Sequence, residues 1–198
     1  MIFSVDNGTG RTVRTQNRSP AEPAVLHNHA MRIRPLAADQ LADIRAIEDA
    51  AGRAFARIGM REIADNDLPT LDTLAWYQAG GRAWAALAGD DRPVGFILVD
   101  VVDGNAHVEQ VSVHPGAAGH RLGAALIDHV GAWAAQCGMP ALTLTTFTDV
   151  PWNGPYYERL GFRPIPDADL GPGLRGVRDE EIRRGLDRWP RTAMIREL

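Results

Sequence analysis

Hydrophobic residues recur at regular spacings along most of the chain, and their periods predict where strands and helices lie. The alternation over residues 31–35 predicts a short strand, and Asp39 is expected as the N-cap of a following helix. The apolar residues of that helix recur at steps of three and four and give it one buried face: Leu41, Ile44, Ile47, Ala51 and Phe55. A second short helix should follow the polar segment 59–67 and end at Gly80.

The middle of the chain alternates between apolar stretches and tight-turn residues. Residues 82–88, 93–102 and 106–113 are predicted strands, and the short Gly/Asp/Asn turns between them favour an antiparallel meander. A long helix should begin near Leu122 and end at Gly138. The remaining predicted elements are a strand at 142–147, a helix at 155–160, a strand at 162–165, a charged helix at 178–189 and a strand at 192–196. This order predicts an α+β fold with a mixed sheet.

Length and composition indicate one folded domain. A chain of 198 residues is long enough for a single full core, and a second core is not expected. Residues 1–30 are rich in Asn, Thr, Arg, Pro and Ser and lack apolar periodicity, so we expect a disordered or non-native tail there. The domain should therefore span residues 31–198.

The charge balance makes two classes of partner improbable on physical grounds. The formal net charge is −4 and the pI is about 5.8, so no broad attraction to nucleic acid or to anionic lipid is expected. No apolar run reaches the ~20 residues that a membrane span requires, and the N-terminus lacks the pattern of a secretory signal. A cytoplasmic location is the expectation.

The segment His107–Ala124 is the most informative part of the sequence, because a predicted strand runs through a small-residue loop into the long helix. The start of a helix offers free backbone N–H groups and the positive end of the helix dipole, which together can hold a pyrophosphate. The loop lacks the Gly-Lys-Ser/Thr ending of a P-loop and the Gly-x-Gly-x-x-Gly fingerprint of a dinucleotide site.

The run from Val111 to Ala124 resembles the acetyl-CoA signature of the GNAT superfamily of N-acetyltransferases, Gln/Arg-x-x-Gly-x-Gly/Ala after a strand ending Val-x-Pro. Ala118 and Arg121 depart from it, standing where Gln or Arg and the middle glycine are usual. The resemblance implies a mostly antiparallel mixed sheet of about seven strands flanked by helices, with acetyl-CoA as co-substrate and no metal. By the same resemblance the residues that bind acetyl-CoA would be Val111, Ser112, Val113, Ala118, Gly119, His120, Arg121, Leu122, Gly123, Ala124 and Asn153.

A second stretch, Asn153 to Phe162, resembles the family's Tyr-Glu-Lys-x-Gly-Phe segment. The resemblance makes Tyr157 the general acid that protonates the departing CoA thiolate and Asn153 a contact of CoA. The family more often places this Asn seven residues before the Tyr, whereas here the spacing is four. A packed core tyrosine and a helix N-cap ahead of Pro155 are the structural alternatives for these two residues.

An ammonium group cannot attack a thioester, so the reaction needs a group that takes a proton from the amine. Glu109 is our candidate, because several members of the family that this sequence resembles carry the base at this strand position. Alternation would place its side chain on the same face as those of Val111 and Val113. The alternative bases are three histidines: His107, His114 and His120.

The resulting hypothesis is direct transfer of an acetyl group from acetyl-CoA to a primary amine of a small molecule, in a ternary complex. We expect the acceptor pocket to be built by residues 59–81 and by the loop Asp167–Gly176, with four acids that could attract a cationic amine: Asp65, Asp67, Asp167 and Asp169. Acetylation of a protein N-terminus or side-chain amine, and a non-catalytic acyl-CoA sensor, are the alternatives. A homodimer is left open.

Overall fold

The computed structural model describes residues 32–198, so the tail expected at residues 1–30 lies outside the described part. Seven strands form one sheet in the order β1-β2-β3-β4-β5-β7-β6. Their bounds are Arg32–Pro35 (β1), Ala83–Leu87 (β2), Pro93–Val102 (β3), Asn105–Val113 (β4), Ala141–Phe147 (β5), Arg163–Ile165 (β6) and Arg191–Glu197 (β7). The predicted fold class and the antiparallel β2-β3-β4 meander are confirmed.

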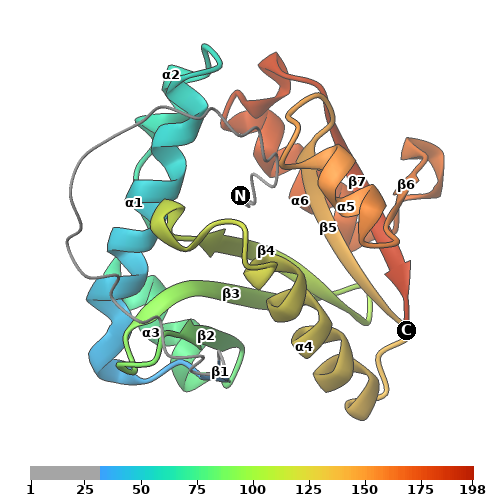
Figure 1. The fold of residues 1–198 in the computed structure, drawn as a ribbon. Helices are drawn as coiled ribbons and strands as arrows, with labels where there is room; N and C mark the ends of the chain where they lie inside the picture. Colours follow the sequence, from blue (N-terminus) through green and yellow to red (C-terminus); the bar gives the residue numbers. More distant parts are fainter. Residues whose placement is uncertain (1–31) are drawn as a thin grey trace, which may run out of the picture.

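The sheet divides between its fourth and fifth strands, which are its parallel pair. Only three residues of β4 pair with β5, from Ala106 opposite Leu142 to Val108 opposite Leu144. Beyond these pairs the two strands diverge, and Figure 1 shows them separating from a common lower end. Among residues 32–198, the rest of β4, residues 109–113, therefore has β3 as its only strand neighbour.

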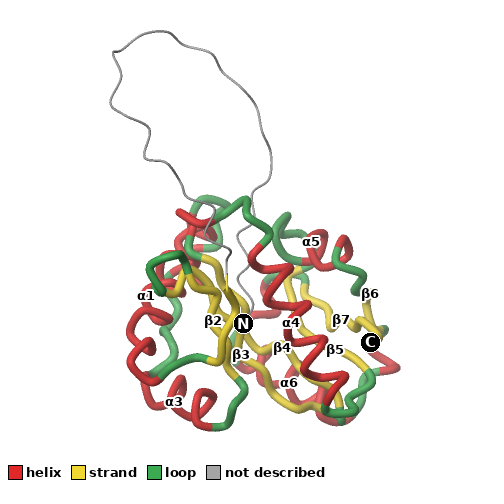
Figure 2. The backbone as a smooth tube through the Cα atoms, turned by 60° about the horizontal axis from the view of Figure 1, so that its bottom comes forward, coloured by secondary structure: helices red, strands yellow, loops and turns green. Residues whose placement is uncertain are grey.

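Helices cover both faces of the sheet. The first two long helices, α1 (Leu41–Ala56) and α3 (Leu71–Ala79), pack on one face, and α4 (Leu122–Gln136) packs on the other, across β4 and β5 (Figure 2). The apolar face predicted for α1 is confirmed, since Ile44, Ile47, Ala51 and Phe55 are buried. The other helices are α2 (Arg61–Ala64), α5 (Gly154–Arg159) and α6 (Pro172–Arg183), with 3-10 turns at Ala38–Gln40, Pro115–Ala117, Asp167–Asp169 and Leu186–Arg188.

Two helix boundaries differ from the sequence prediction. Asp39 is not the N-cap of α1, because it lies inside the 3-10 turn that precedes the helix, and Gln40 takes the N-cap position. Helix α6 starts at Pro172 and ends at Arg183, whereas the prediction was 178–189. The early start depends on Asp103 in the β3–β4 turn, whose carboxylate accepts hydrogen bonds from the N–H groups of Gly173 (2.8 Å) and Leu174 (2.9 Å). A distant side chain thus caps a helix start that is rich in Gly and Pro.

This cap predicts that Asp103→Ala lowers the free energy of unfolding by about 1–2 kcal/mol, because two N–H groups at the positive end of α6 lose their acceptor. Asp91→Ala is the matched control: Asp91 also has a positive φ in a hairpin turn, but its carboxylate pairs only with exposed Arg32. Urea denaturation of both variants measures the difference. Equal losses would show that the positive φ, and not the cap, accounts for the effect.

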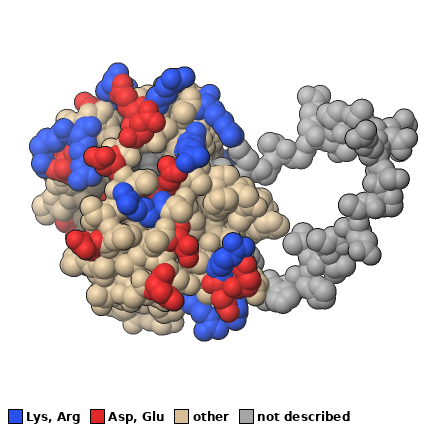
Figure 3. All heavy atoms as spheres, turned by 90° about the vertical axis from the view of Figure 1, so that its left-hand side faces the viewer, with Lys and Arg blue, Asp and Glu red and all other residues tan. Residues whose placement is uncertain are grey.

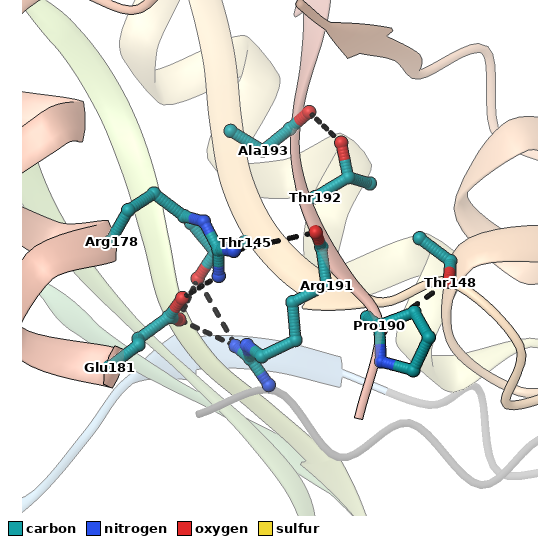
Figure 4. A network of polar contacts seen from close by, with 8 residues as sticks. All are labelled: Thr145, Thr148, Arg178, Glu181, Pro190, Arg191, Thr192 and Ala193. Atoms are coloured by element: carbon teal, nitrogen blue, oxygen red, sulfur yellow. Dashed lines mark hydrogen bonds and ion pairs between the residues drawn. The ribbon is translucent and has the colours of Figure 1, made fainter. Parts of the chain in front are cut away.

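Helix α6 is also tied to the sheet by a buried ionic cluster (Figure 4). The carboxylate of Glu181 lies between two guanidinium groups, those of Arg178 and Arg191, each at 2.5 Å, and it accepts a hydrogen bond from Thr145 Oγ1 at 2.5 Å. The Arg191 side chain is fully buried and its guanidinium stacks on the Phe147 ring at 4.3 Å. This cluster positions the inner face of α6 against the diverging strand β5.

Within residues 32–198 no helix is long and apolar enough to cross a membrane. Acidic and basic side chains are interspersed on the face that carries α1 (Figure 3), so that face shows no continuous basic surface.

Candidate active site

Strand β4 contains a β-bulge at Glu109. Leu98 pairs with Gln110 and Val99 pairs with Val108, so Glu109 is an extra residue opposite β3. The side chains of Val108 and Val111 therefore share the core beneath α4, and the predicted alternation is wrong: Val111 and Val113 lie on the face opposite Glu109. Because of the bulge, Glu109 and Gln110 both face the α1 side, where both line a cavity.

Backbone groups of β4 face the gap between the diverging strands. The N–H of His114 donates to the carbonyl of Val94 at 2.8 Å, which directs alternate residues, including Ser112, toward β3. The peptide groups of Val111 and Val113 then face the side where pairing with β5 has ended. The hydroxyl of Ser112 accepts a hydrogen bond from Gln110 Nε2 at 2.9 Å on the cavity side.

The loop after β4 ends in an open helix start. Gly119 has a φ of +85°, and Arg121, the N-cap of α4, is left-handed at φ 55° and ψ 28°. The first hydrogen bond of the helix runs from Ala125 N–H to the Arg121 carbonyl at 3.0 Å. The N–H groups of Leu122, Gly123 and Ala124 precede it and have no acceptor within the helix, as at any helix start, and such groups can bind an anion. Ala118 is half-buried beside it, and His120 is exposed.

Tyr157 is held in the core on the other side of the gap. Its side chain is fully buried, and among the described residues its hydroxyl has no hydrogen-bond partner. Burial raises the pKa of the Tyr157 phenol well above its usual value, so the group is protonated at neutral pH. The helix α5 that carries it lies tight against the end of β5: a Cβ at Gly154 would lie 2.8 Å from the Thr148 carbonyl oxygen.

Asn153 precedes α5 and is fully buried. Asn153 is the N-cap residue of α5, as the structural alternative has it, but its side chain makes no capping hydrogen bond. Its Nδ2 donates instead to Thr146 Oγ1 on β5 at 3.0 Å, and its backbone carbonyl accepts the N–H groups of Tyr156 and Tyr157. Asn153 thus joins the end of β5 to the helix that carries Tyr157.

Two cavities of about 420 and 390 Å³ lie on the α1 side of the sheet and share two lining residues, Glu109 and Arg184. The larger is walled by α1 and by residues 63–77, which agrees with the predicted use of the 59–81 segment. The smaller is walled by α6. Glu109 therefore lies at the junction of two cavities of small-molecule size.

The acids of these cavities differ from those predicted. Among residues 32–198, only Asp67 of the four expected acids lines either cavity, and Asp169 lines a separate hollow beside β6. The reason is the early start of α6, which turns its inner face, and not the preceding loop, toward Glu109. The sequence analysis missed Glu48. A carboxylate one turn after Ile44, on the apolar stripe of α1, was the signal that could have found it.

The three histidines are placed less favourably than Glu109 as a base. His107 is 1% exposed, its Nδ1 lies 3.0 Å from Thr143 Oγ1, and burial lowers the pKa of its imidazole. His114 uses its Nδ1 to accept the N–H of Gly116 at 3.1 Å. Neither cavity has a histidine among its described lining residues, whereas Glu109 lines both.

A sequence model of the acetyltransferase (GNAT) family matches residues 44–162, more than half of the chain. This chain belongs to the GNAT family. It is therefore an acyltransferase whose co-substrate is acetyl-CoA. The match includes β4, the loop, α4 and the helix that carries Tyr157.

Solved structures agree with the GNAT fold. The PaiA N-acetyltransferase from Thermoplasma acidophilum, in complex with coenzyme A, is 14% identical, with a TM-score of 0.62 over 85% of this chain and 99% of that one. The ribosomal-protein-S18-alanine N-acetyltransferase from Escherichia coli is 18% identical, with a TM-score of 0.58 over 84% of this chain and 93% of that one. N-acetylglutamate synthase from Neisseria gonorrhoeae is 16% identical, with a TM-score of 0.63 over 85% of this chain and 35% of that one. At such identities the likeness shows the fold and leaves the acceptor open.

The residues of this GNAT chain fit acetyl-CoA. Tyr157, whose buried hydroxyl has no hydrogen-bond partner among residues 32–198, shares a core cluster with residues of β4 and β5, and the start of α4 offers backbone donors whose hydrogen bonds a diphosphate could accept. In residues 32–198 no three His, Cys, Asp or Glu side chains are grouped to hold a metal ion.

Replacing Arg121 by glycine should change stability and coenzyme A binding in opposite directions. Arg121→Gly should raise the free energy of unfolding by about 1 kcal/mol, because a left-handed backbone is unfavourable for a residue with a Cβ. The same change should weaken coenzyme A binding about 5- to 10-fold, because a guanidinium at the helix start can contact a phosphate. Pantetheine, which lacks the diphosphate, is the control ligand in calorimetry and should bind both proteins equally. Unchanged coenzyme A affinity would restrict Arg121 to a role in loop geometry.

Proposed function

We propose that this acetyltransferase transfers the acetyl group to a primary amine of a small molecule by direct attack in a ternary complex. The observation that carries the proposal is the position of Glu109. The bulge places its side chain at the junction of two cavities, next to the point where β4 and β5 separate. An amine bound there would lie between the carboxylate and the gap that receives the pantetheine arm.

The proposed roles of the residues follow from the proton balance. The acetyl group moves from sulfur to nitrogen: the ammonium loses one proton before it attacks, its nitrogen loses a second as the amide forms, and the departing sulfur gains one, so one proton is released in each turnover. The carboxylate of Glu109 takes the proton of the ammonium, directly or through water. The phenol of Tyr157 holds a proton on the opposite side of the gap, where burial keeps it protonated. The N–H groups of Val111 and Val113 orient the pantetheine amides and the thioester oxygen.

The size of the two cavities favours a small molecule over a protein as the acceptor. Both cavities lie within the size range of small-molecule sites, and helices α1 and α6 wall them from two sides. A protein N-terminus or side-chain amine, and a sensor that binds acyl-CoA without turnover, are the competing functions. The homodimer and the cytoplasmic location stay predictions.

The test is release of free coenzyme A thiol from acetyl-CoA in the presence of an amine library, with products identified by mass spectrometry. Turnover of small amines in preference to peptides supports the proposal. Turnover of peptides alone would identify a protein acceptor. Binding of acetyl-CoA without turnover on any amine would favour the sensor.

A further inference from the structure

Among the described residues, six acidic side chains line the two cavities, and three of them, Asp49, Glu180 and Glu181, pair with cations of the chain. Glu181 is held by Arg178 and Arg191. Glu180 pairs with Arg183 and with Arg184, whose Nε lies 2.8 Å from its Oε1. Asp49 pairs with Arg53 on the exposed side of α1. These carboxylates are neutralised by residues of the chain itself.

Glu48 is different. Its side chain comes from the buried stripe of α1, lines the larger cavity together with Glu109, and is only 6% exposed. Its Oε2 is buried and, among the described residues, has no hydrogen-bond partner. Burial raises the pKa of this carboxyl group to about 7, and the negative charge of Glu109 contributes to the rise. A buried carboxyl oxygen without a hydrogen-bond partner destabilises the protein unless a ligand compensates it.

Two lining groups that could compensate Glu48 have other partners. Arg184 is the basic residue of the larger cavity, and its Nε is bound to Glu180. The hydroxyl of Tyr77, on the same wall, donates to Asp100 Oδ2 at 2.9 Å. The cavity therefore brings together two acids from different elements, Glu48 and Glu109, and no described residue forms an ion pair with Glu48.

We propose that the acceptor carries a second cationic group, and that Glu48 binds this group while the reacting nitrogen lies at Glu109. The inference rests on the proposed transfer to a small-molecule amine and narrows the acceptor to diamines and longer polyamines. An acceptor with a carboxylate in place of the second ammonium is disfavoured, because it would meet the like charge of Glu48.

The experiment compares three acceptors of equal chain length in the full-length protein: butane-1,4-diamine, butylamine and 4-aminobutanoate. We expect kcat/KM for the diamine to exceed that for butylamine by about 10-fold or more, with 4-aminobutanoate the poorest. Glu48→Gln should reduce the diamine to about the level of butylamine and leave butylamine itself nearly unchanged. The matched control, Asp43→Asn, removes one charge from an exposed position of the same helix and should leave the ratio unaltered.

Two further sets of measurements distinguish a loss of diamine recognition from a loss of folding or of turnover. Thermal unfolding and coenzyme A affinity of Glu48→Gln show whether the variant is folded, and the comparison of acceptors in the unaltered protein does not depend on any variant. Calorimetry of butane-1,4-diamine with the coenzyme A complex tests binding without turnover.

The outcomes separate this inference from the proposed function. Acetylation of amines with equal kcat/KM for diamine and monoamine, or a diamine preference that survives Glu48→Gln, would overturn the assignment of Glu48 and leave the proposed function intact. Diamine binding that is lost in Glu48→Gln, without turnover of any amine, would support the site and refute the proposed function. Failure of the diamine both to bind and to react preferentially overturns the inference.

Discussion

Tyr157→Phe is expected to lower kcat by about 10²- to 10³-fold while the Kd of coenzyme A changes by less than about twofold. The substitution removes only the hydroxyl, and the ring keeps its contacts with Phe162 and Tyr156 in the core. Without the proton held there, the departing sulfur must leave as a thiolate. Steady-state kinetics and calorimetry on the same preparation measure the two quantities.

The stability of the same variant distinguishes a catalytic tyrosine from a packed one. Because the Tyr157 hydroxyl is buried without a partner among residues 32–198, its removal should leave the free energy of unfolding unchanged or raise it by up to about 1 kcal/mol. Tyr156→Phe is the control one residue earlier on α5 and should keep its turnover. Full turnover in Tyr157→Phe, or equal losses in the two variants, would remove Tyr157 from the mechanism.

Glu109→Gln is expected to lower kcat/KM by about 100-fold at pH 7, with a loss that shrinks as the pH rises. The loss shrinks with rising pH because of the protonation of the acceptor amine. An alkylammonium has a pKa near 10.4, so the neutral fraction of the amine increases about tenfold for each pH unit below that value, and the variant depends on that fraction. In the unaltered protein Glu109 deprotonates the bound ammonium, so its rate depends less on the fraction of amine that is already neutral in solution.

The pH profile is the decisive part of this measurement. Glu62→Gln, on α2 and paired with Arg188 at the surface, controls for the loss of a negative charge and should follow the profile of the unaltered protein. A loss in Glu109→Gln that is the same from pH 7 to 9.5 would speak against a base and favour a role in binding the cationic acceptor.

Much of the fold could be predicted from the sequence, because it depends on local periodicity. The apolar stripe of α1, the three strands of the meander and the long helix after the small-residue loop each follow from side chains a few residues apart. The candidate residues Glu109 and Tyr157 came from the resemblance of their segments to the GNAT superfamily, not from periodicity. Their roles stay predictions until the experiments above are done.

The tertiary structure decided which of these side chains meet. The bulge that directs Glu109 toward the cavities appears only when β4 is paired with β3, and the start of α6 depends on Asp103, 70 residues away from Gly173. The exposure of Glu48 to a cavity likewise depends on how α1 lies against the sheet. Sequence alone determined the elements and the open helix start, since these are set by interactions within a few residues. The tertiary fold determined which residues line the acceptor site, because burial and strand register depend on contacts between segments far apart in the chain.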